Sequence, residues 1–378
     1  MSKNKKQNQL DGIAEATRGM LFGQDHANAG RYAYLNGGGV KFDEFIRLNE
    51  NYLTFWKECE ILSEQSKTIA HELEDVKHAV VVGQGSAFKD KEWHVLKELP
   101  NLEAITFIDL AEKFNQAALK TVKDNAHEMK SKDVKATAIT GPYQGIDKKM
   151  LDRWSKDYDK NLVMCVGSLI TNIEKIAKDS YPETETYNEL KQLFRLACND
   201  GYALIGYNGV EKQSTLQKSY ANKLLAEFMQ NAWHFMVMNT PDLRIEDING
   251  NILDKNDRDV LDSLFAYEID EPKFDPATRN YAHIMKAKKS FKVYCNDENS
   301  ADGDHDEICK DIEAGYSFTM MNSYQASTSI INSLVKNISS TAKSYDAKEI
   351  ISRSKDNIFL HSFKITPNTE QPAEQKPS

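Results

Sequence analysis

Short apolar runs alternate with longer amphipathic stretches through the middle of the chain. The runs are mostly β-branched or aromatic and almost continuously hydrophobic: HAVVVG (78–83), AITFID (104–109), VKATAI (134–139), LVMCVG (162–167) and YALIGY (202–207). Such runs are typical of parallel strands that are buried on both faces. Helical patterns lie between them, for example at 92–99 and 186–197. The alternation predicts a doubly wound α/β sheet.

The rhythm changes after residue 210. Apolar residues at every fourth position predict one long amphipathic helix over 212–239. Two further strands are predicted near 281–294 and 316–324, and the strand at 358–365 (IFLHSFKI) is expected to return to the first sheet. Two chain crossings between one sheet and another unit imply a second, discontinuous α+β domain.

These features predict the domain boundaries. We assign residues 61–210 plus 325–365 to the sheet domain and residues 13–60 plus 211–324 to the second domain. Residues 1–12 are rich in Lys, Asn and Gln, and residues 366–378 in Pro, Gln and Glu, so both ends are predicted to be disordered. The acidic run at 296–307 is predicted to be a solvated loop, because it lacks the ligand spacing of a calcium loop.

Composition narrows the class of protein. A chain of 378 residues with 40% hydrophobic residues can bury a sizeable core and suggests two domains, while the net charge of −9 argues against a general nucleic-acid binder. The five cysteines are scattered without metal-ligand spacing, which favours a reducing cytoplasm and predicts no metal site. We see no secretory signal and no apolar stretch long enough to span a bilayer, so no membrane association is expected.

The first candidate chemistry lies at the ends of two predicted strands. Gly83 and Gly85 in VVVGQGSAFKDK (80–91) follow one strand, and Asp109 ends the next. Glycines there let a ligand approach the backbone, and a carboxylate suits the hydroxyls of a ribose. Nicotinamide enzymes and methyltransferases share this pairing. A plain tight turn, with Asp109 as a helix cap, is the simpler alternative.

Two observations favour a methyltransferase over a nicotinamide oxidoreductase. The third glycine of GxGxxG is missing, so a pyrophosphate cradle is incomplete. The fourth strand ends in the polar loop VGSLITN (166–172), at the edge where substrates of such sheets bind.

The chain resembles the histidine-specific Nα-methyltransferases of ergothioneine biosynthesis, a family that includes dimethylallyltryptophan N-methyltransferases. The resemblance covers most of residues 30–365. Its most specific block, LVMCVGSLITNI (162–173), is similar to the family's strand followed by GSTIGN, and QKSYANKLLAEFMQN (217–231) is similar to its AYDDAAGVTAAFNRN. The resemblance implies a Rossmann-like S-adenosylmethionine-dependent methyltransferase sheet and a second, substrate-binding domain.

The resemblance also implies roles for individual residues. It places the cofactor beside Tyr34, Gly83, Gly85, Lys89, Asp109, Gly141 and Tyr143, with the lysine suited to the cofactor's methionine carboxylate. Asn172 would hold the substrate's α-amine, Tyr220 its carboxylate, and Tyr52 would line the same pocket. Three of these residues have simpler alternatives: Tyr220 could be a core residue, Asn172 a helix cap and Lys89 an exposed lysine.

The departures from the family concern the adenine and the substrate side chain. The family's GDF appears as Gly141-Pro142-Tyr143, so adenine must be held by backbone groups and Tyr143. The ExSxK motif, whose glutamate and serine grip an imidazole, appears as Thr319-Met320-Met321-Asn322-Ser323, which makes a pocket lined by Thr319 and Met321 less polar. A buried imidazole N–H without a partner costs about 1–3 kcal/mol.

We therefore predict an N-methyltransferase that acts on the α-amino group of an amino acid or related small amine, with histidine not preferred. Two alternatives stay open at this point. A methyltransferase fold that binds ligands without catalysis is favoured by Pro142 and Asn208. A histidine Nα-methyltransferase would require that the pocket departures are tolerated.

Overall fold

The computed structural model describes residues 3–22, 32–167, 169–173, 182–197, 200–270, 273–296, 307–341 and 345–367. For residues 3–9, 172, 173, 182, 183, 185, 345 and 367 it describes the backbone alone. The chain divides into two compact units. Unit 1 comprises Met1–Tyr52, Asn172–Pro182 and Glu211–Tyr324, and unit 2 comprises Leu53–Thr171, Glu183–Val210 and Gln325–Ser378.

Unit 2 is built on a seven-stranded sheet with the order β15-β16-β6-β4-β1-β2-β3. The first five strands of this sheet in chain order run parallel, whereas β16 pairs antiparallel with both β6 and β15. The doubly wound sheet and the return of 358–365 to it are thereby confirmed. The bounds are β1 His78–Val82, β2 Ala104–Asp109, β3 Lys135–Thr140, β4 Asn161–Cys165, β6 Gly201–Asn208, β15 Tyr345–Lys355 and β16 Ile358–Pro367.

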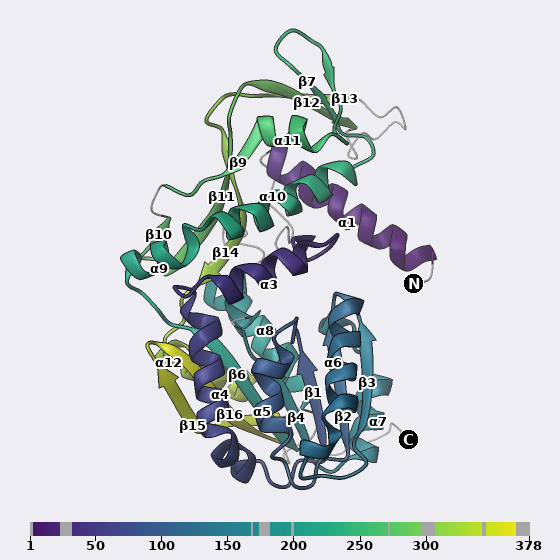
Figure 1. Ribbon diagram of the computed structural model, residues 1–378, viewed down its shortest axis with the longest axis vertical. Coiled ribbons are helices and arrows are strands. Elements are labelled where there is room, and N and C mark those ends of the chain that lie inside the picture. Colours follow the sequence, from purple (N-terminus) through teal and green to yellow (C-terminus); the bar gives the residue numbers. More distant parts are fainter. Residues whose placement is uncertain are drawn as a thin grey trace, which may run out of the picture. The chain divides into compact units, whose positions relative to one another are not determined.

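Helices cover this sheet, and Figure 1 shows α4, α5 and α6 lying over one of its faces. The bounds are α4 Leu53–Glu72, α5 Glu92–Leu96, α6 Glu112–Asp124, α7 Lys148–Asp157, α8 Pro182–Leu196 and α12 Thr328–Thr341, with short 3₁₀ turns η1 Phe88–Asp90, η2 Ala126–Glu128, η3 Tyr143–Gly145 and η4 Leu169–Thr171. Because β1 lies between β2 and β4, the connections leave it in opposite directions. The carboxyl ends of β1 and β4 therefore flank the switch point at which such sheets bind ligands.

The apolar runs explain why these strands are central. Every residue of β1 and of β4 is buried, and Val81, Phe107 and Leu162 belong to one continuous core cluster. Fully burying a side chain of this size contributes about 1.5–3 kcal/mol. The carboxyl ends of these strands are thus anchored to a well-packed core.

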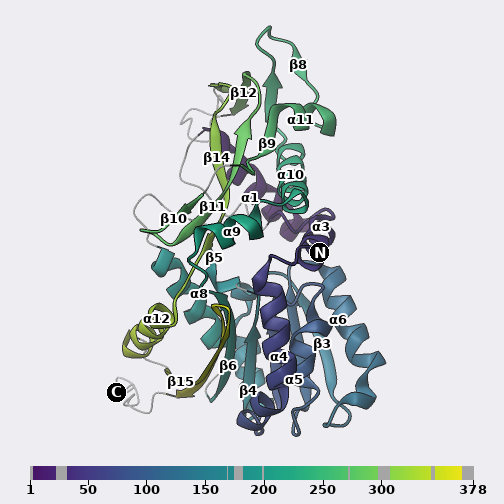
Figure 2. The same cartoon turned by 60° about the vertical axis from the view of Figure 1, so that its left-hand side comes forward.

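Unit 1 combines helices with two smaller antiparallel sheets, and Figure 2 shows its strands from a second direction. Its helices are α1 Lys3–Phe22, α3 Gly38–Leu48, α9 Gln213–Tyr220, α10 Lys223–Met238 and α11 Arg258–Leu264. One sheet has the order β10-β11-β14-β5, with β9 also paired to β11; the other has the order β13-β12-β7-β8. The bounds are β5 Asn172–Ile173, β7 Arg244–Glu246, β8 Ile252–Leu253, β9 Phe265–Tyr267, β10 Phe274–Asp275, β11 Asn280–Ala287, β12 Phe291–Asn296, β13 Glu307–Ile312 and β14 Ser317–Tyr324.

Two predicted elements of unit 1 are each divided in the structure. The prediction of a single helix over 212–239 is wrong, because α9 ends at Tyr220. Asn222 then caps α10, since its side-chain oxygen accepts the Leu224 N–H at 2.8 Å. An N-cap asparagine satisfies an N–H that the helix itself leaves free. The predicted strand near 281–294 is two strands, β11 and β12, which belong to different sheets.

The ends and the boundaries also differ from the prediction. Disorder is predicted for residues 1–12, whereas α1 begins at Lys3 in the structure. The first boundary falls between Tyr52 and Leu53, so that α4 belongs wholly to unit 2, and residues 172–182 belong to unit 1. Residues 297–306 of the acidic run and 368–378 of the tail lie outside the described residues.

Candidate active site

The glycine turn and the acid that follow β1 and β2 meet at the carboxyl edge of unit 2. Gly83 and Gly85 have φ of 63° and 56°, a left-handed conformation that favours glycine. The Gly85 N–H donates to Asp109 Oδ2 at 3.1 Å, and the Ala111 N–H donates to Oδ1 at 2.8 Å. Burial raises the pKa of Asp109, and these two N–H donors oppose that rise. Each carboxyl oxygen keeps a lone pair for a ligand hydroxyl.

A buried pair of amides supports this turn. Gln84 and Asn115 are 1% exposed, and the Gln84 side-chain N–H donates to Asn115 Oδ1 at 2.9 Å. Asn115 in turn donates to the Ile139 carbonyl at 3.1 Å. The turn after β1 is thereby tied to the ends of β2 and β3. Sequence reasoning missed this role, although the position of Gln84 between the two glycines could have indicated it.

The third strand brings Gly141 and Tyr143 to the same edge. The Gly141 N–H donates to the Asp109 carbonyl at 3.0 Å, which joins the ends of β2 and β3. Tyr143 is buried, and its hydroxyl has no hydrogen-bond partner in the described part of the chain. An unsatisfied buried hydroxyl costs about 1–3 kcal/mol, so this group is suited to a ligand that supplies a donor or an acceptor. Adenine supplies both.

The two lysines after the glycine turn lie in different surroundings. Lys89 is exposed, and its ammonium lies 3.4 Å from Asn125 Oδ1, at the C-terminal end of α6. Because α6 begins beside Asp109 and its 13 residues span about 20 Å, the Lys89 ammonium lies at the opposite end of α6 from Asp109. Lys91 is buried instead, and its ammonium lies 3.4 Å from Glu58 Oε2.

In unit 1, Tyr220 is the centre of an aromatic cluster. Its ring centroid lies 4.6 Å from that of Tyr281, 4.9 Å from that of His283 and 6.1 Å from that of Tyr52. The break after α9 places Tyr220 at the helix end, facing β11. The structure therefore brings together the predicted Tyr52 and Tyr220 and adds two residues of β11 that sequence reasoning missed. Their alternation with half-buried residues at 280–287 is the signal that could have found them.

A β-bulge separates Thr319 from Met321. Thr319 pairs with Ile284 and Met321 with His283, so Met320 is the extra residue in β14. Thr319 is exposed and Met321 is buried. The prediction that both line one pocket came from the family resemblance, and the bulge turns the two side chains to different faces of β14. Met321 and Ser323 instead lie opposite His283 and Tyr281, on the face towards Tyr220.

His283 uses both of its ring nitrogens within this cluster. Nδ1 lies 2.9 Å from the Tyr267 hydroxyl, and Nε2 lies 3.0 Å from the Ser323 hydroxyl. Burial, followed by the positive charge of Lys273, lowers the pKa of His283 to about 3. The imidazole is therefore neutral at physiological pH, with one nitrogen donating and the other accepting.

Two predicted residues remain less defined. The Tyr34 ring packs against Phe42 and Phe228 in unit 1, with centroid distances of 5.1 and 5.2 Å. The Asn172 backbone pairs with Ser323 in β5–β14, and its side chain lies outside the described residues. Their roles toward cofactor and substrate stay predictions.

A parallel, doubly wound sheet with a glycine turn after its first strand and an acid at the tip of its second defines a Rossmann-like cofactor-binding domain. A family profile described as "Histidine-specific methyltransferase, SAM-dependent" matches residues 18–343. The chain belongs to this family of histidine-specific, SAM-dependent methyltransferases. Its cofactor is therefore S-adenosylmethionine.

Two solved methyltransferase structures match the chain at low similarity. The plantazolicin methyltransferase BpumL, in complex with SAH, is 14% identical over 64% of this chain and 81% of its own, with a TM-score of 0.32. The O-methyltransferase TomG from Streptomyces achromogenes, in complex with SAM, is 12% identical over 48% of this chain and 71% of its own, with a TM-score of 0.24. No curated protein sequence matches the chain.

One further finding concerns the membrane. Across the described ranges, no helix combines the length and the apolar character that a transmembrane span requires.

Proposed function

We propose that this chain methylates the α-amino nitrogen of an amino acid or a related small amine, and that histidine is not its preferred acceptor. The observation that carries the proposal is the occupation of the Ser323 hydroxyl by the chain's own imidazole, that of His283. In the ExSxK alignment Thr319 stands in place of the glutamate and Met321 in place of the serine. The glutamate and the serine with which the family's motif binds an imidazole are therefore both replaced by other residues.

The residues of unit 2 fit the cofactor. Asp109 offers acceptor oxygens for the ribose hydroxyls, the backbone at Gly85 faces open space, and Tyr143 offers a buried hydroxyl for adenine. Lys91, rather than Lys89, is the buried cation beside this edge, and we assign it to the carboxylate of the cofactor. Bound S-adenosylmethionine supplies an electrophilic methyl group on a sulfonium.

The residues of unit 1 are assigned to the acceptor. Tyr220 and Tyr52 would anchor its carboxylate, and Asn172 would orient its amine. The amine must be neutral to attack, and its ordinary pKa of about 8 leaves a neutral fraction at cellular pH. In the displacement, the nitrogen lone pair would form the new N–C bond while the C–S pair would stay on sulfur, and the nitrogen would then lose a proton to water. The protein's contribution is mainly orientation.

The aromatic cluster also indicates the acceptor side chain. Tyr220, Tyr281 and His283 present ring surfaces, and Met321 adds an apolar, polarisable side chain. An aliphatic or aromatic side chain is satisfied by such surroundings, whereas an imidazole N–H is not.

A methyl-acceptor screen tests the proposal. The purified chain is incubated with methyl-labelled S-adenosylmethionine and each of the standard amino acids, and mass spectrometry locates the methyl group. We expect methylation of the α-nitrogen, with kcat/KM for an aromatic or aliphatic amino acid at least about tenfold above that for histidine, which corresponds to one unpaired buried polar group. A preference for histidine would overturn the substrate assignment, and methylation of oxygen or carbon would overturn N-methylation.

A single substitution sharpens the screen. Met321→Glu introduces a carboxylate opposite His283 that could accept a hydrogen bond from a substrate imidazole, so we expect kcat/KM for histidine to rise by about tenfold. Thr319→Glu, on the exposed side of the bulge, is the matched control and should leave the preference unchanged. A gain for histidine with Thr319→Glu alone would contradict the placement of these two residues.

A further inference from the structure

A charged residue lies among apolar side chains in unit 2. Glu58 is fully buried on α4, on the same helix face as Ile61 and Leu62. Removing a carboxylate from water costs several kcal/mol unless other groups compensate. The compensating groups show what this residue holds in place.

Glu58 holds one group from each of two loops. Its Oε1 accepts the Gly167 N–H at 2.9 Å, and its Oε2 lies 3.4 Å from the Lys91 ammonium. A Cβ atom on Gly206 would collide with Oε1, so β6 requires a glycine where the carboxylate passes. Lys91 itself lies against Gly167, whose φ is +100°.

The two loops flank the switch point of the sheet. Lys91 follows β1, Gly167 follows β4, and these strands are parallel neighbours. The crevice beyond the carboxyl ends of two such strands is where open α/β sheets bind ligands. Glu58 therefore joins the loops that follow β1 and β4.

The buried acids around Lys91 outnumber the buried bases. Glu92 is also fully buried beside Lys91, and neither of its carboxyl oxygens has a hydrogen-bond partner in the described ranges. Two acids thus share one ammonium. A buried ion pair is by itself weak evidence of stabilisation, because apolar replacements are often equally stable. Residues that violate such rules in natural proteins are commonly found at functional sites.

We propose that Glu58 is a positioning residue of the cofactor site, acting through the Lys91 ammonium and the Gly167 N–H to set the affinity of unit 2 for S-adenosylmethionine and S-adenosylhomocysteine. The inference rests on the proposed placement of the cofactor at this edge. Glu58 itself touches neither ligand, since it lies behind the two loops that do. Lys91 keeps two further N–H donors for an anionic group.

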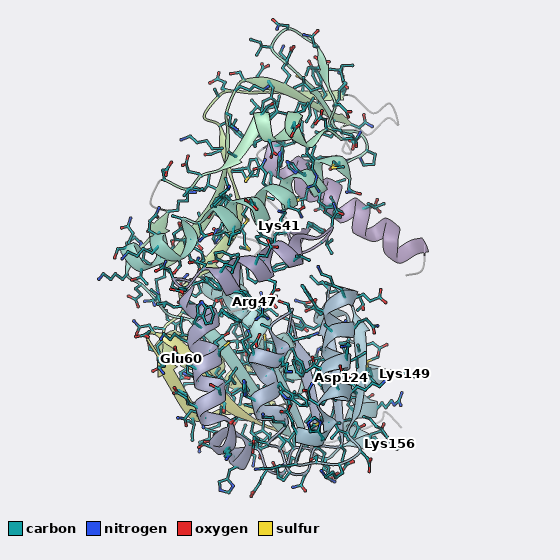
Figure 3. The ribbon with its side chains drawn as sticks, in the orientation of Figure 1. Lys41, Arg47, Glu60, Asp124, Lys149 and Lys156 are labelled. Atoms are coloured by element: carbon teal, nitrogen blue, oxygen red, sulfur yellow. The ribbon has the colours of Figure 1, made fainter. Side chains whose placement is uncertain are left out.

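Calorimetry with S-adenosylhomocysteine tests this inference on the full chain. Glu58→Gln preserves the shape and an acceptor oxygen but removes the charge that orients Lys91, so the Kd should rise about tenfold or more. Glu60→Gln, two residues along α4 and labelled in Figure 3, changes an exposed ion pair and should leave the Kd within about twofold. In turnover assays the KM for S-adenosylmethionine should rise by a larger factor than kcat falls.

A double-mutant cycle identifies the route of the effect. On a Lys91→Met background, Glu58→Gln should raise the Kd by less than about threefold, because the group through which it acts is gone. Additive effects would overturn the role assigned to Lys91. If Glu58→Gln does not fold, Glu58→Asp keeps the charge on a shorter side chain, and it should still raise the Kd at least about threefold.

The outcomes separate this inference from the proposed function. A Glu58→Gln or Glu58→Asp variant that melts at a lower temperature but binds S-adenosylhomocysteine like the parent would show that Glu58 is only structural. A parent chain that does not bind S-adenosylhomocysteine would overturn the cofactor placement itself.

Discussion

The two groups of candidate residues differ in charge. The candidate residues at the carboxyl edge of unit 2 are ionisable: the half-buried Asp109 and the buried Glu58, Lys91 and Glu92. On the Tyr220 face of unit 1 the candidate residues are neutral: Tyr220, Tyr281, His283, Met321 and Ser323. The first group suits a charged cofactor with hydroxyls and a carboxylate, and the second suits an uncharged side chain.

The difference also predicts how each region responds to pH. Burial and the nearby Lys273 keep His283 neutral down to about pH 3, so the Tyr220 face has constant polarity across the physiological range. Glu92 is different, because burial raises its pKa to about 7 in spite of the attraction of Lys91. We therefore expect a change of pH near 7 to alter the charge of Glu92 in unit 2 and to leave His283 in unit 1 neutral.

The largest effect is expected for Glu92→Gln. The native pKa of about 7 lies above the ordinary value of 4.5, so the native state binds more protons between these values and the free energy of unfolding falls as pH rises through that window. Above pH 7 the ionised carboxylate costs on the order of 3 kcal/mol. Glu92→Gln removes this cost, and urea unfolding should show the variant more stable than the parent at pH 8 but not at pH 4. Parallel pH profiles would contradict the burial of an ionisable Glu92.

Asp109→Asn is expected to have the next largest effect. Hydrogen bonds from ligand hydroxyls to a charged acceptor contribute about 1.5–3 kcal/mol, so the Kd for S-adenosylhomocysteine should rise about 30-fold by calorimetry. The KM for the amine acceptor should change little, since its residues are assigned to unit 1. Unchanged cofactor affinity would remove the ribose assignment.

Two controls make this measurement specific. Asp124→Asn changes an exposed acid at the end of α6, labelled in Figure 3, and should leave the Kd unaltered. Lys89→Ala should do the same within about twofold, because its exposed ammonium lies against Asn125 Oδ1. A large loss with Lys89→Ala would restore the role that the sequence resemblance implied for it.

The smallest of the three effects is expected for Tyr220→Phe. Losing one hydroxyl that binds the acceptor's carboxylate should raise the acceptor KM about tenfold and leave the Kd for S-adenosylhomocysteine unchanged. Tyr294→Phe, on β12 with Arg244 over its ring, is the matched control in the same unit. If Tyr220→Phe weakened cofactor binding instead, the division of labour between the two units would be wrong.

Part of the candidate site could be predicted because it depends on short-range patterns. Continuous apolar runs end at Val82 and Asp109, and in a parallel sheet these ends meet at one edge. The glycines and the acid follow the strands directly, so their proximity needs no knowledge of the remaining chain.

Other residues could be placed only with the tertiary structure. Lys89 and Lys91 are two positions apart with the same chemistry, and the short turn η1 decides which of them is buried. The bulge at Met320 is set by pairing with β11, which lies more than thirty residues earlier in the chain. Sequence spacing alone would have predicted that Thr319 and Met321 share a face.

The sequence by itself determined the alternation of strands and helices in the sheet domain, the glycine turn with Asp109 and the family, because these depend on short patterns of neighbouring residues. Only the tertiary structure decided that Glu58 reaches Gly167, 109 positions away, and that His283 bonds Ser323, 40 positions away. Such contacts follow from how buried charges and hydroxyls must be satisfied once distant segments pack together, and no local pattern encodes their partners.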